Sequence, residues 1–121
     1  GNNVTSIGKN SFSGCSKLKT LTIGNNVALI GDNAFSNCTS LKKVTIPVKV
    51  KKIGKQAFYG CKKLKTIKIN TKKLSGKFVG SKAFAKIDPK AAVKVPSSCL
   101  KSYKKLFQKK GFNGKKQKIK K

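Results

Sequence analysis

The sequence predicts an α/β solenoid, in which a short unit is repeated and stacks on copies of itself. The 121-residue chain repeats with a period of 23 residues, and the recurring positions are nearly all apolar. Each unit also ends in alternating apolar and polar residues, the pattern of a strand with one buried face. A unit of this length cannot form a core alone, so it must bury its inner side against its neighbours.

Four repeats can be aligned, over residues 2–24, 25–47, 48–70 and 71–96. The fourth is three residues longer than the others, and the extra length falls before Val79. The period is lost after Pro96. We therefore expect a repeat array over 1–96 and a C-terminal part over 97–121. Because residues 1–4 repeat as residues 24–27, we expect the chain to begin at a repeat boundary, as a part of a longer protein.

The end of each unit predicts a strand, over residues 21–23, 44–46 and 67–69, where β-branched residues alternate with polar ones. Successive copies run in the same direction, so they predict a parallel sheet with about 4.8 Å between strands. The Ala-Phe-x-x-Cys segment before each strand predicts a single helical turn, and we expect Phe35 and Phe58 in the core. Gly14, Asn37 and Gly60 suit a left-handed residue that ends this turn.

Cys15, Cys38 and Cys61 share one repeat position, and Cys99 follows the array. Side chains at one position of a stack point in the same direction rather than at each other. We therefore expect buried free thiols and no disulfides. The chain has no histidine and no Cys-x-x-Cys pair, so a zinc site is not expected, and no cofactor is indicated.

The C-terminal part predicts an amphipathic helix over residues 98–110 that caps the last repeat. Ser97 or Ser98 is expected to cap its start. Its apolar residues share one face; they are Leu100, Tyr103, Leu106 and Phe107. Gly111 followed by Phe112 predicts its end. A membrane-surface helix is the alternative, because lysines flank the apolar stripe. Residues 115–121 form a basic tail whose one apolar residue is Ile119.

The strand motif Leu18-x-x-Leu21-x-Ile23 and its copies resemble the signature of leucine-rich repeats. The longer pattern I-G-x-x-A-F-x-x-C-x-x-L-x-x-V-x-I-P, over residues 30–47, resembles the BspA-like (bacterial surface antigen) type. The resemblance covers residues 2–96. It implies a right-handed solenoid, with the parallel sheet on the concave face and short helical turns on the convex side. It also implies an exported or surface-attached protein that binds or adheres and has no enzyme activity.

All thirty basic residues are lysines, against two acidic residues, and the formal net charge is +28. Lysine lacks the planar fork that reads phosphates and guanine edges, so this surface favours general attraction of polyanions. Only five lysines lie in residues 1–47. The candidate polyanion contacts are pairs from the rest of the chain: Lys51, Lys52, Lys62, Lys63, Lys72, Lys73, Lys104, Lys105, Lys109 and Lys110.

No pattern for catalysis is present. Without histidine, no Ser-His or Cys-His pair can form, and Asp32 and Asp88 occupy different repeat positions. Repeat proteins bind through their broad sheet face. The candidate binding residues are the outward-facing positions of the strands: Thr20, Thr22, Lys43, Thr45, Thr66, Lys68 and Lys94.

Two functions fit these observations. The first is an exported or cell-surface module that binds a protein, on a host or a neighbouring cell, through the sheet face. The second is attachment to cell-wall polymers, acidic glycans or extracellular nucleic acid through the lysines. Neither involves a small-molecule substrate. No apolar run approaches the ~18 residues that span a membrane, and the sequence leaves the oligomeric state open.

Overall fold

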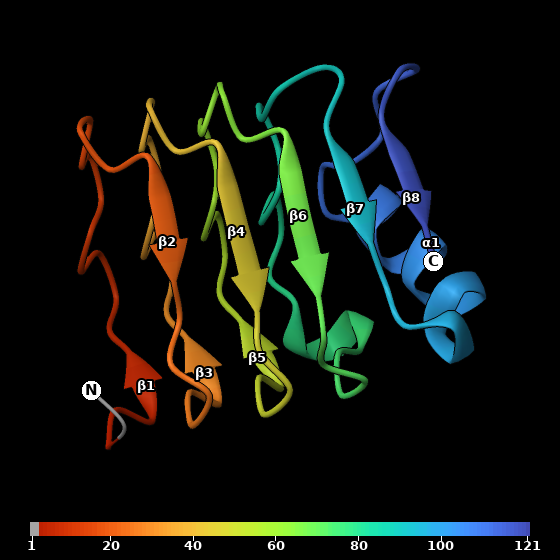
Figure 1. Cartoon of the computed structure of the whole chain (residues 1–121), viewed down its shortest axis with the longest axis horizontal. Helices are drawn as coiled ribbons and strands as arrows, with labels where there is room; N and C mark the ends of the chain where they lie inside the picture. The colour runs from red at the N-terminus through yellow and green to blue at the C-terminus, as the bar shows by residue number, and fades with distance from the viewer. Residues whose placement is uncertain (1–2) are drawn as a thin grey trace.

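The computed structural model describes residues 3–121, and in them the chain forms the predicted solenoid (Figure 1). Gly1 and Asn2, where the first repeat was expected to begin, lie outside the described residues. Successive coils are stacked along the long axis, and a helix closes the C-terminal end. The predicted fold class, an α/β repeat solenoid with a C-terminal helix, is confirmed.

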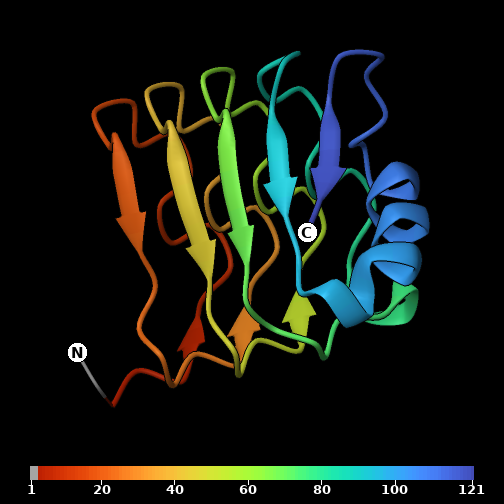
Figure 2. The same ribbon diagram turned by 45° about the vertical axis from the view of Figure 1, so that its right-hand side comes forward.

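A five-stranded parallel sheet forms one side of the stack (Figure 2). Its strands lie in the order β2, β4, β6, β7, β8. The first four are the predicted strands, and they span Thr20–Thr22, Lys43–Ile46, Thr66–Ile69 and Ala92–Lys94. Val44 pairs with Leu21 on one side and Ile67 on the other, so neighbouring repeats are in register at the 23-residue period. At one edge lies β2.

The other edge strand, β8, spans Lys118–Lys120 and was not predicted. It pairs in parallel with β7, and Ile119 lies opposite Val93. Ile119 is half-buried and packs against the core. The C-terminal tail therefore adds one more strand to the sheet of the repeats.

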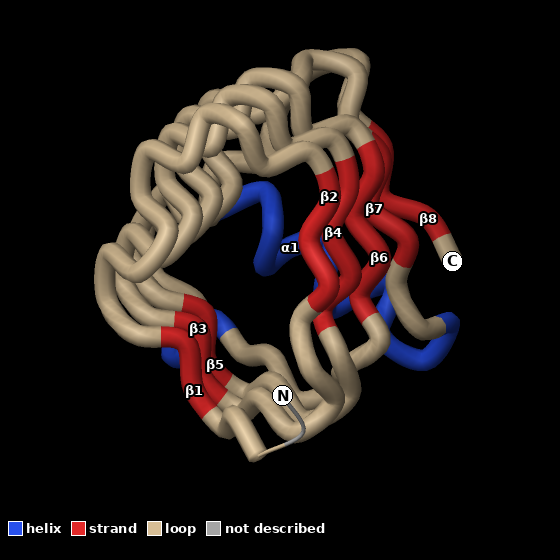
Figure 3. The backbone as a smooth tube through the Cα atoms, turned by 60° about the vertical axis from the view of Figure 1, so that its left-hand side comes forward, coloured by secondary structure: helices blue, strands red, loops and turns tan. Residues whose placement is uncertain are grey.

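A second parallel sheet lies on another side of each coil (Figure 3). Its two-residue strands are β1 (Ser6–Ile7), β3 (Leu29–Ile30) and β5 (Lys52–Ile53). An isolated bridge between Ile53 and Val79 continues the row into the fourth repeat. The sequence identified the Ile-Gly column here but did not predict its pairing.

The segments between the two sheets differ from the prediction, because the Ala-Phe-x-x-Cys stretches do not form a helical turn. They form successive turns closed by bonds between residues three apart, such as the Ala34 N–H to the Gly31 oxygen (3.2 Å). Residues with left-handed backbone angles prevent these turns from forming a helix. The predicted ones are present, with φ of 76° at Gly14, 58° at Asn37 and 77° at Gly60. A second left-handed row was not predicted: Asn10, Asn33, Gln56 and Lys82.

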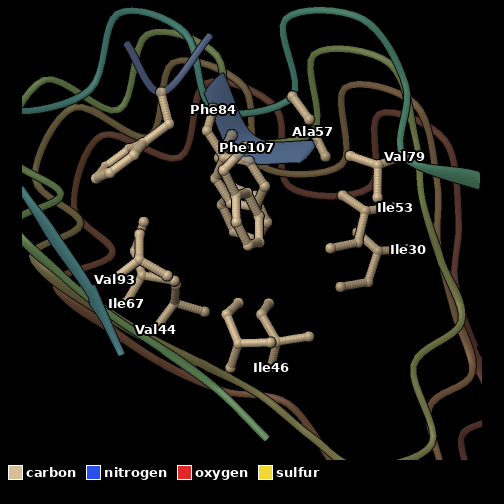
Figure 4. Packing of buried hydrophobic residues seen from close by; sticks show 14 of the residues in the cluster. Ile30, Val44, Ile46, Ile53, Ala57, Ile67, Val79, Phe84, Val93 and Phe107 are labelled. Atoms are coloured by element: carbon tan, nitrogen blue, oxygen red, sulfur yellow. The ribbon is translucent and has the colours of Figure 1, made fainter. Parts of the chain in front are cut away.

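The core is a set of columns that run through the stack, as predicted (Figure 4). Phe12, Phe35, Phe58 and Phe84 stack as near-parallel rings, with centroids 5.3, 5.3 and 5.5 Å apart. Phe35 and Phe58 are fully buried, whereas Phe12, on the first coil, is 43% exposed. The cysteines are free, and three of the four are buried. The thiols of Cys38 and Cys61 donate to the carbonyls of Phe12 and Phe35, in the preceding repeat.

The C-terminal cap consists of a 3-10 turn, η2 (Ser97–Cys99), that leads into α1 (Leu100–Lys109). The predicted serine cap is wrong: neither Ser97 nor Ser98 bonds a free N–H of the first turn, because the 3-10 turn continues directly into the helix. The predicted end is confirmed. Gly111 has φ of 103°, and the Phe112 N–H donates to the Phe107 oxygen at 2.9 Å.

The helix replaces a further repeat in two ways. The Phe107 ring meets Phe84 edge-on, with centroids 5.0 Å apart, so it ends the aromatic stack. The carboxyl end of the helix also continues a row of backbone hydrogen bonds between repeats. The first three stacked phenylalanines each donate their N–H to an alanine carbonyl in the next repeat, whereas Phe84 donates to the Lys110 oxygen at 3.0 Å. These bonds agree with the predicted capping role.

Candidate binding surface

The outer face of the five-stranded sheet carries all seven of the residues that the sequence proposed for binding. Parallel register arranges this face as two columns across the strands. The first column is Thr20, Lys43, Thr66, Ala92 and Lys118. The second is Thr22, Thr45, Lys68, Lys94 and Lys120. Thr45 and Ala92 are half-buried, and the other eight side chains are exposed.

Charge is unevenly distributed along these columns. The strands of the first two repeats present mainly threonine, whereas the second column ends in three consecutive lysines, Lys68, Lys94 and Lys120. Neighbouring strands of a parallel sheet lie about 4.8 Å apart, so these ammonium groups extend from adjacent rungs. Sequence reasoning missed Lys118 and Lys120. The alternation Lys-Ile-Lys, like Ile67-Lys68-Ile69, was the signal that could have placed them.

The lysine pairs proposed for polyanion binding do not form one patch. Lys52 lies in β5 of the small sheet, and Lys62 and Lys63 lie in the turn before β6. Lys104, Lys105 and Lys109 lie on α1, with Lys110 just after it. All of the proposed lysines are exposed except Lys110, which is half-buried. The charge is therefore spread over several sides of the solenoid.

One hollow of about 300 Å³ lies where β6, β7 and β8 end. Four lysines line it: Lys68, Lys72, Lys94 and Lys121. Lys68 and Lys94 come from the proposed sheet face, and Lys72 comes from the proposed polyanion pairs. A second hollow, between α1 and β8, is lined by Lys104, Lys118 and Lys120 among other residues. The fold thus brings together lysines that are far apart in sequence.

Both acidic residues are engaged with the backbone. Asp32 Oδ1 accepts the Lys55 N–H at 2.9 Å, and Asp88 Oδ1 accepts the Lys90 N–H at 2.8 Å. Asp32 follows β3 of the small sheet, and Asp88 lies in the turn before β7. Neither carboxylate is among the residues that line the four-lysine hollow.

The groups with shifted pKa values belong to the core. Burial raises the pKa of the Cys61 thiol to about 12, and it raises the pKa of the Cys38 thiol as well. Burial likewise raises the pKa of the Tyr103 hydroxyl to about 12. Nucleophilic cysteines have lowered pKa values, so these two thiols are packing groups.

Two further observations concern residues 3–121 as a whole. This part of the chain holds no group of three His, Cys, Asp or Glu side chains arranged to bind a metal ion. None of its helices has the length and hydropathy needed to cross a bilayer.

The stacked coils, parallel sheets and continuous apolar columns define a repeat solenoid. The family model for the BspA type leucine rich repeat region matches residues 1–113, with six copies. The chain belongs to this family, as its repeat motif suggested. Neither a curated protein nor a solved structure matches the chain. The family is a repeat scaffold often used for protein interaction and often associated with surfaces, and it is typically non-enzymatic.

Proposed function

We propose that the chain is a non-enzymatic binding and adhesion module, exported or held at a cell surface, that recognises a protein partner through its five-stranded sheet. One observation carries this proposal: the outer face of the sheet is a regular array of exposed polar side chains on a rigid frame. Repeat proteins typically bind partners on such a face. The backbone of the face is held by in-register pairing, so little ordering entropy is lost on binding.

The absence of histidine from the sequence and the engagement of both aspartates with backbone N–H groups support a non-enzymatic role. Burial raises the pKa values of the Cys38 and Cys61 thiols, so neither thiol is activated as a nucleophile. We therefore assign the chain recognition rather than chemistry.

The experiment is capture of extracellular proteins on the immobilised full chain in 0.5 M salt, which suppresses attraction by charge alone. Two double variants are compared. Thr22→Arg with Thr45→Arg places two large side chains on the outer face of the large sheet. Ser6→Arg with Leu29→Arg places the same two side chains on exposed positions of the small sheet. A partner retained by wild type and by the small-sheet variant, but lost by the large-sheet variant, supports the proposal. Equal retention by all three proteins contradicts it.

The lysine column favours a second candidate function, in which the chain is a polyanion-binding module that attaches to cell-wall polymers, acidic glycans or extracellular nucleic acid. Lys68, Lys94 and Lys120 extend from adjacent strands, and the sequence offers only two acidic residues to oppose thirty lysines. Such attachment weakens steeply as the salt concentration rises. Binding releases counterions condensed on the polyanion, and the entropy gained by their release is smaller in concentrated salt. Retention on wall-polymer, heparin and DNA matrices at 0.05 M and 0.5 M salt tests it.

A further inference from the structure

The carboxyl ends of β6, β7 and β8 border the four-lysine hollow. We propose that the hollow there binds a linear glycan carrying sulfate or carboxylate groups on successive sugar units. The inference rests on the second candidate function and names its site and its ligand.

The hollow combines positive charge with hydrogen-bonding groups. Its lysines are Lys68, Lys72, Lys94 and Lys121, and Asn70 and Ser97 line it beside them. Lys68 lies in β6, and Lys94 is the last residue of β7. Lys72 follows β6, and Lys121 follows β8. In Figure 2 the ends of β6, β7 and β8 lie side by side, and the C-terminus lies beside β7. Charges from three segments of the chain, at the ends of β6, β7 and β8, therefore border one small volume.

Neither of the two aspartate side chains lines this cluster. Register pairs Lys68 with Lys94, and Lys94 with Lys120, and like charges directly opposite each other across strands destabilise a sheet. Asp88 lies before β7, near the opposite ends of the strands, and Asp32 follows β3 in the other sheet. An anionic ligand would relieve the repulsion and would gain from all four lysines at once.

A polymer fits the arrangement better than a small anion does. The lysines continue beyond the hollow, because Lys120 extends the column to the edge strand and Lys118 lies beside it on β8. Lys118 and Lys120 also border the second hollow, together with Lys104 of α1. A chain with an anionic group on each unit could follow this path from one hollow to the other.

The chemistry of the lining favours a glycan over nucleic acid. Single-stranded nucleic acids bind where aromatic side chains stack on their bases, and no aromatic residue lines the hollow. Tyr103, on the helix below β7, is buried, and its hydroxyl donates to the Thr71 carbonyl. Lysine also lacks the fork that grips phosphate and base edges, and it serves as a hydrated point charge. Sulfate and carboxylate groups on a flexible glycan match such charges.

The test is calorimetric titration of the full chain with a heparin hexasaccharide in 0.1 M salt. The hollow variant carries Lys68→Gln, Lys72→Gln and Lys94→Gln. The control variant carries Lys9→Gln, Lys17→Gln and Lys55→Gln, which remove the same charge from exposed positions elsewhere. Each lysine should contribute on the order of fivefold to the affinity, so we expect the hollow variant to bind the hexasaccharide roughly 100-fold more weakly than wild type. The slope of log affinity against log salt should also fall by about 2, at ~0.7 for each lysine. The control should lose less than about tenfold.

Other results would overturn the inference in distinct ways. Equal losses of affinity in the two variants would rule out the hollow as the binding site, while general polyanion binding would still stand. Failure of wild type to bind the hexasaccharide would rule out both the hollow as a binding site and general polyanion binding. Tighter binding of an oligothymidylate of equal charge, lost in the hollow variant, would reassign the site to nucleic acid. A carboxylated oligogalacturonate, tested beside heparin, distinguishes the two anionic groups. Protein capture in 0.5 M salt is independent of all these outcomes, so the two proposals can fail separately.

Discussion

At the scale of single residues, the aromatic stack forms one continuous column of the core. Phe35 lies between the rings of Phe12 and Phe58, at interplanar angles of 3° and 12°, and it is fully buried. Phe35→Ala should lower the free energy of unfolding by about 3–5 kcal/mol, through lost burial and the cavity that remains. Urea denaturation followed by circular dichroism measures the change.

Phe12 is the matched control, because it has the same repeat position but one stacking partner and an exposed face. Phe12→Ala should cost only about 1–2 kcal/mol. Equal costs at the two positions, or a cost below about 1 kcal/mol for Phe35→Ala, would contradict the stacking.

The buried thiol of Cys61 predicts a specific loss of stability in alkali. Its pKa is about 12 in the folded chain and 9.0 in the unfolded chain. The unfolded state therefore loses its proton first, and stability that is complete below pH 9 is lost as the pH rises toward 12. The stability advantage of wild type over Cys61→Ala should shrink by about 1.4 kcal/mol between pH 8 and pH 10. An advantage that does not change with pH would place the thiol in contact with water.

Gly54 is required by the space between coils rather than by its backbone angles. A Cβ atom at this position would overlap the backbone of Asp32 and Gly31 in the preceding coil. Gly54→Ala should therefore force the coils apart and cost about 2 kcal/mol or more. At Gly76 a Cβ atom would meet nothing within 4 Å, so Gly76→Ala should change stability by less than about 0.5 kcal/mol. Thermal unfolding of the two variants measures the contrast, and similar losses would refute it.

At the scale of elements, the Tyr103 hydroxyl holds the C-terminal helix on the last repeat together with the Phe107–Phe84 ring contact. Tyr103 Oη donates to the Thr71 carbonyl at 2.8 Å and accepts the Leu74 N–H at 3.2 Å, and both bonds are buried. Tyr103→Phe should cost about 1–3 kcal/mol, because it leaves a buried donor and a buried acceptor without partners.

Ser102→Ala is the control on the same helix. Its exposed hydroxyl donates only to Cys99 O, a bond within the cap, so the cost should stay below about 1 kcal/mol. Protection of the α1 amides from hydrogen exchange should fall in Tyr103→Phe and not in Ser102→Ala. Unchanged protection in Tyr103→Phe would show that the hydroxyl does not hold the helix.

Strands and helices with apolar periodicity could be predicted from the sequence. Strands that form only by pairing with a neighbouring strand could not. The four repeat strands and the helix follow from residues that recur at fixed intervals, such as Val44 in β4 and Leu106 in α1. The small sheet was missed because two residues per strand give no alternation to detect. The helical turns were wrong because Asn33 and Gln56 adopt left-handed angles, and the chain has no glycine there to signal them.

The candidate surface was predictable in part for the same reason. Thr45 and Lys68 could be placed on the outer face from the alternation of their strands. Lys120 could not, because the tail holds a single apolar residue, Ile119, and becomes a strand only by pairing with β7. The four-lysine hollow depends on where three strands end together, which is a property of the tertiary structure alone.

At the scale of the whole molecule, the solenoid joins an apolar interior to a surface of almost one sign. Repeats stack along one direction, so lysines at equivalent positions are brought onto neighbouring rungs rather than separated. The net charge of +28 is therefore concentrated by the fold itself. Self-repulsion of this kind opposes the compact state, and the unfolded chain relieves it by expanding.

This repulsion predicts that added salt stabilises the chain. Screening lengths fall from about 30 Å at 0.01 M to about 10 Å at 0.1 M, so most repulsion across the molecule is lost in this range. The melting temperature should rise between these concentrations, at roughly 3–6 °C for each 1 kcal/mol gained. Circular dichroism during heating measures it, and the gain should level off above about 0.5 M if screening is the cause.

The hollow variant gives a sharper form of the same prediction. Replacing Lys68 and Lys94 with glutamine removes a pair of charges that lie opposite each other across β6 and β7, and Lys72→Gln removes a third beside the same hollow. The control replaces Lys9, Lys17 and Lys55, which lie outside the sheet. At 0.01 M salt the hollow variant should therefore melt at a higher temperature than the control, and the two should converge as salt is added. A melting temperature that does not depend on salt in any of the three proteins would show that the lysine columns are too well hydrated to oppose folding.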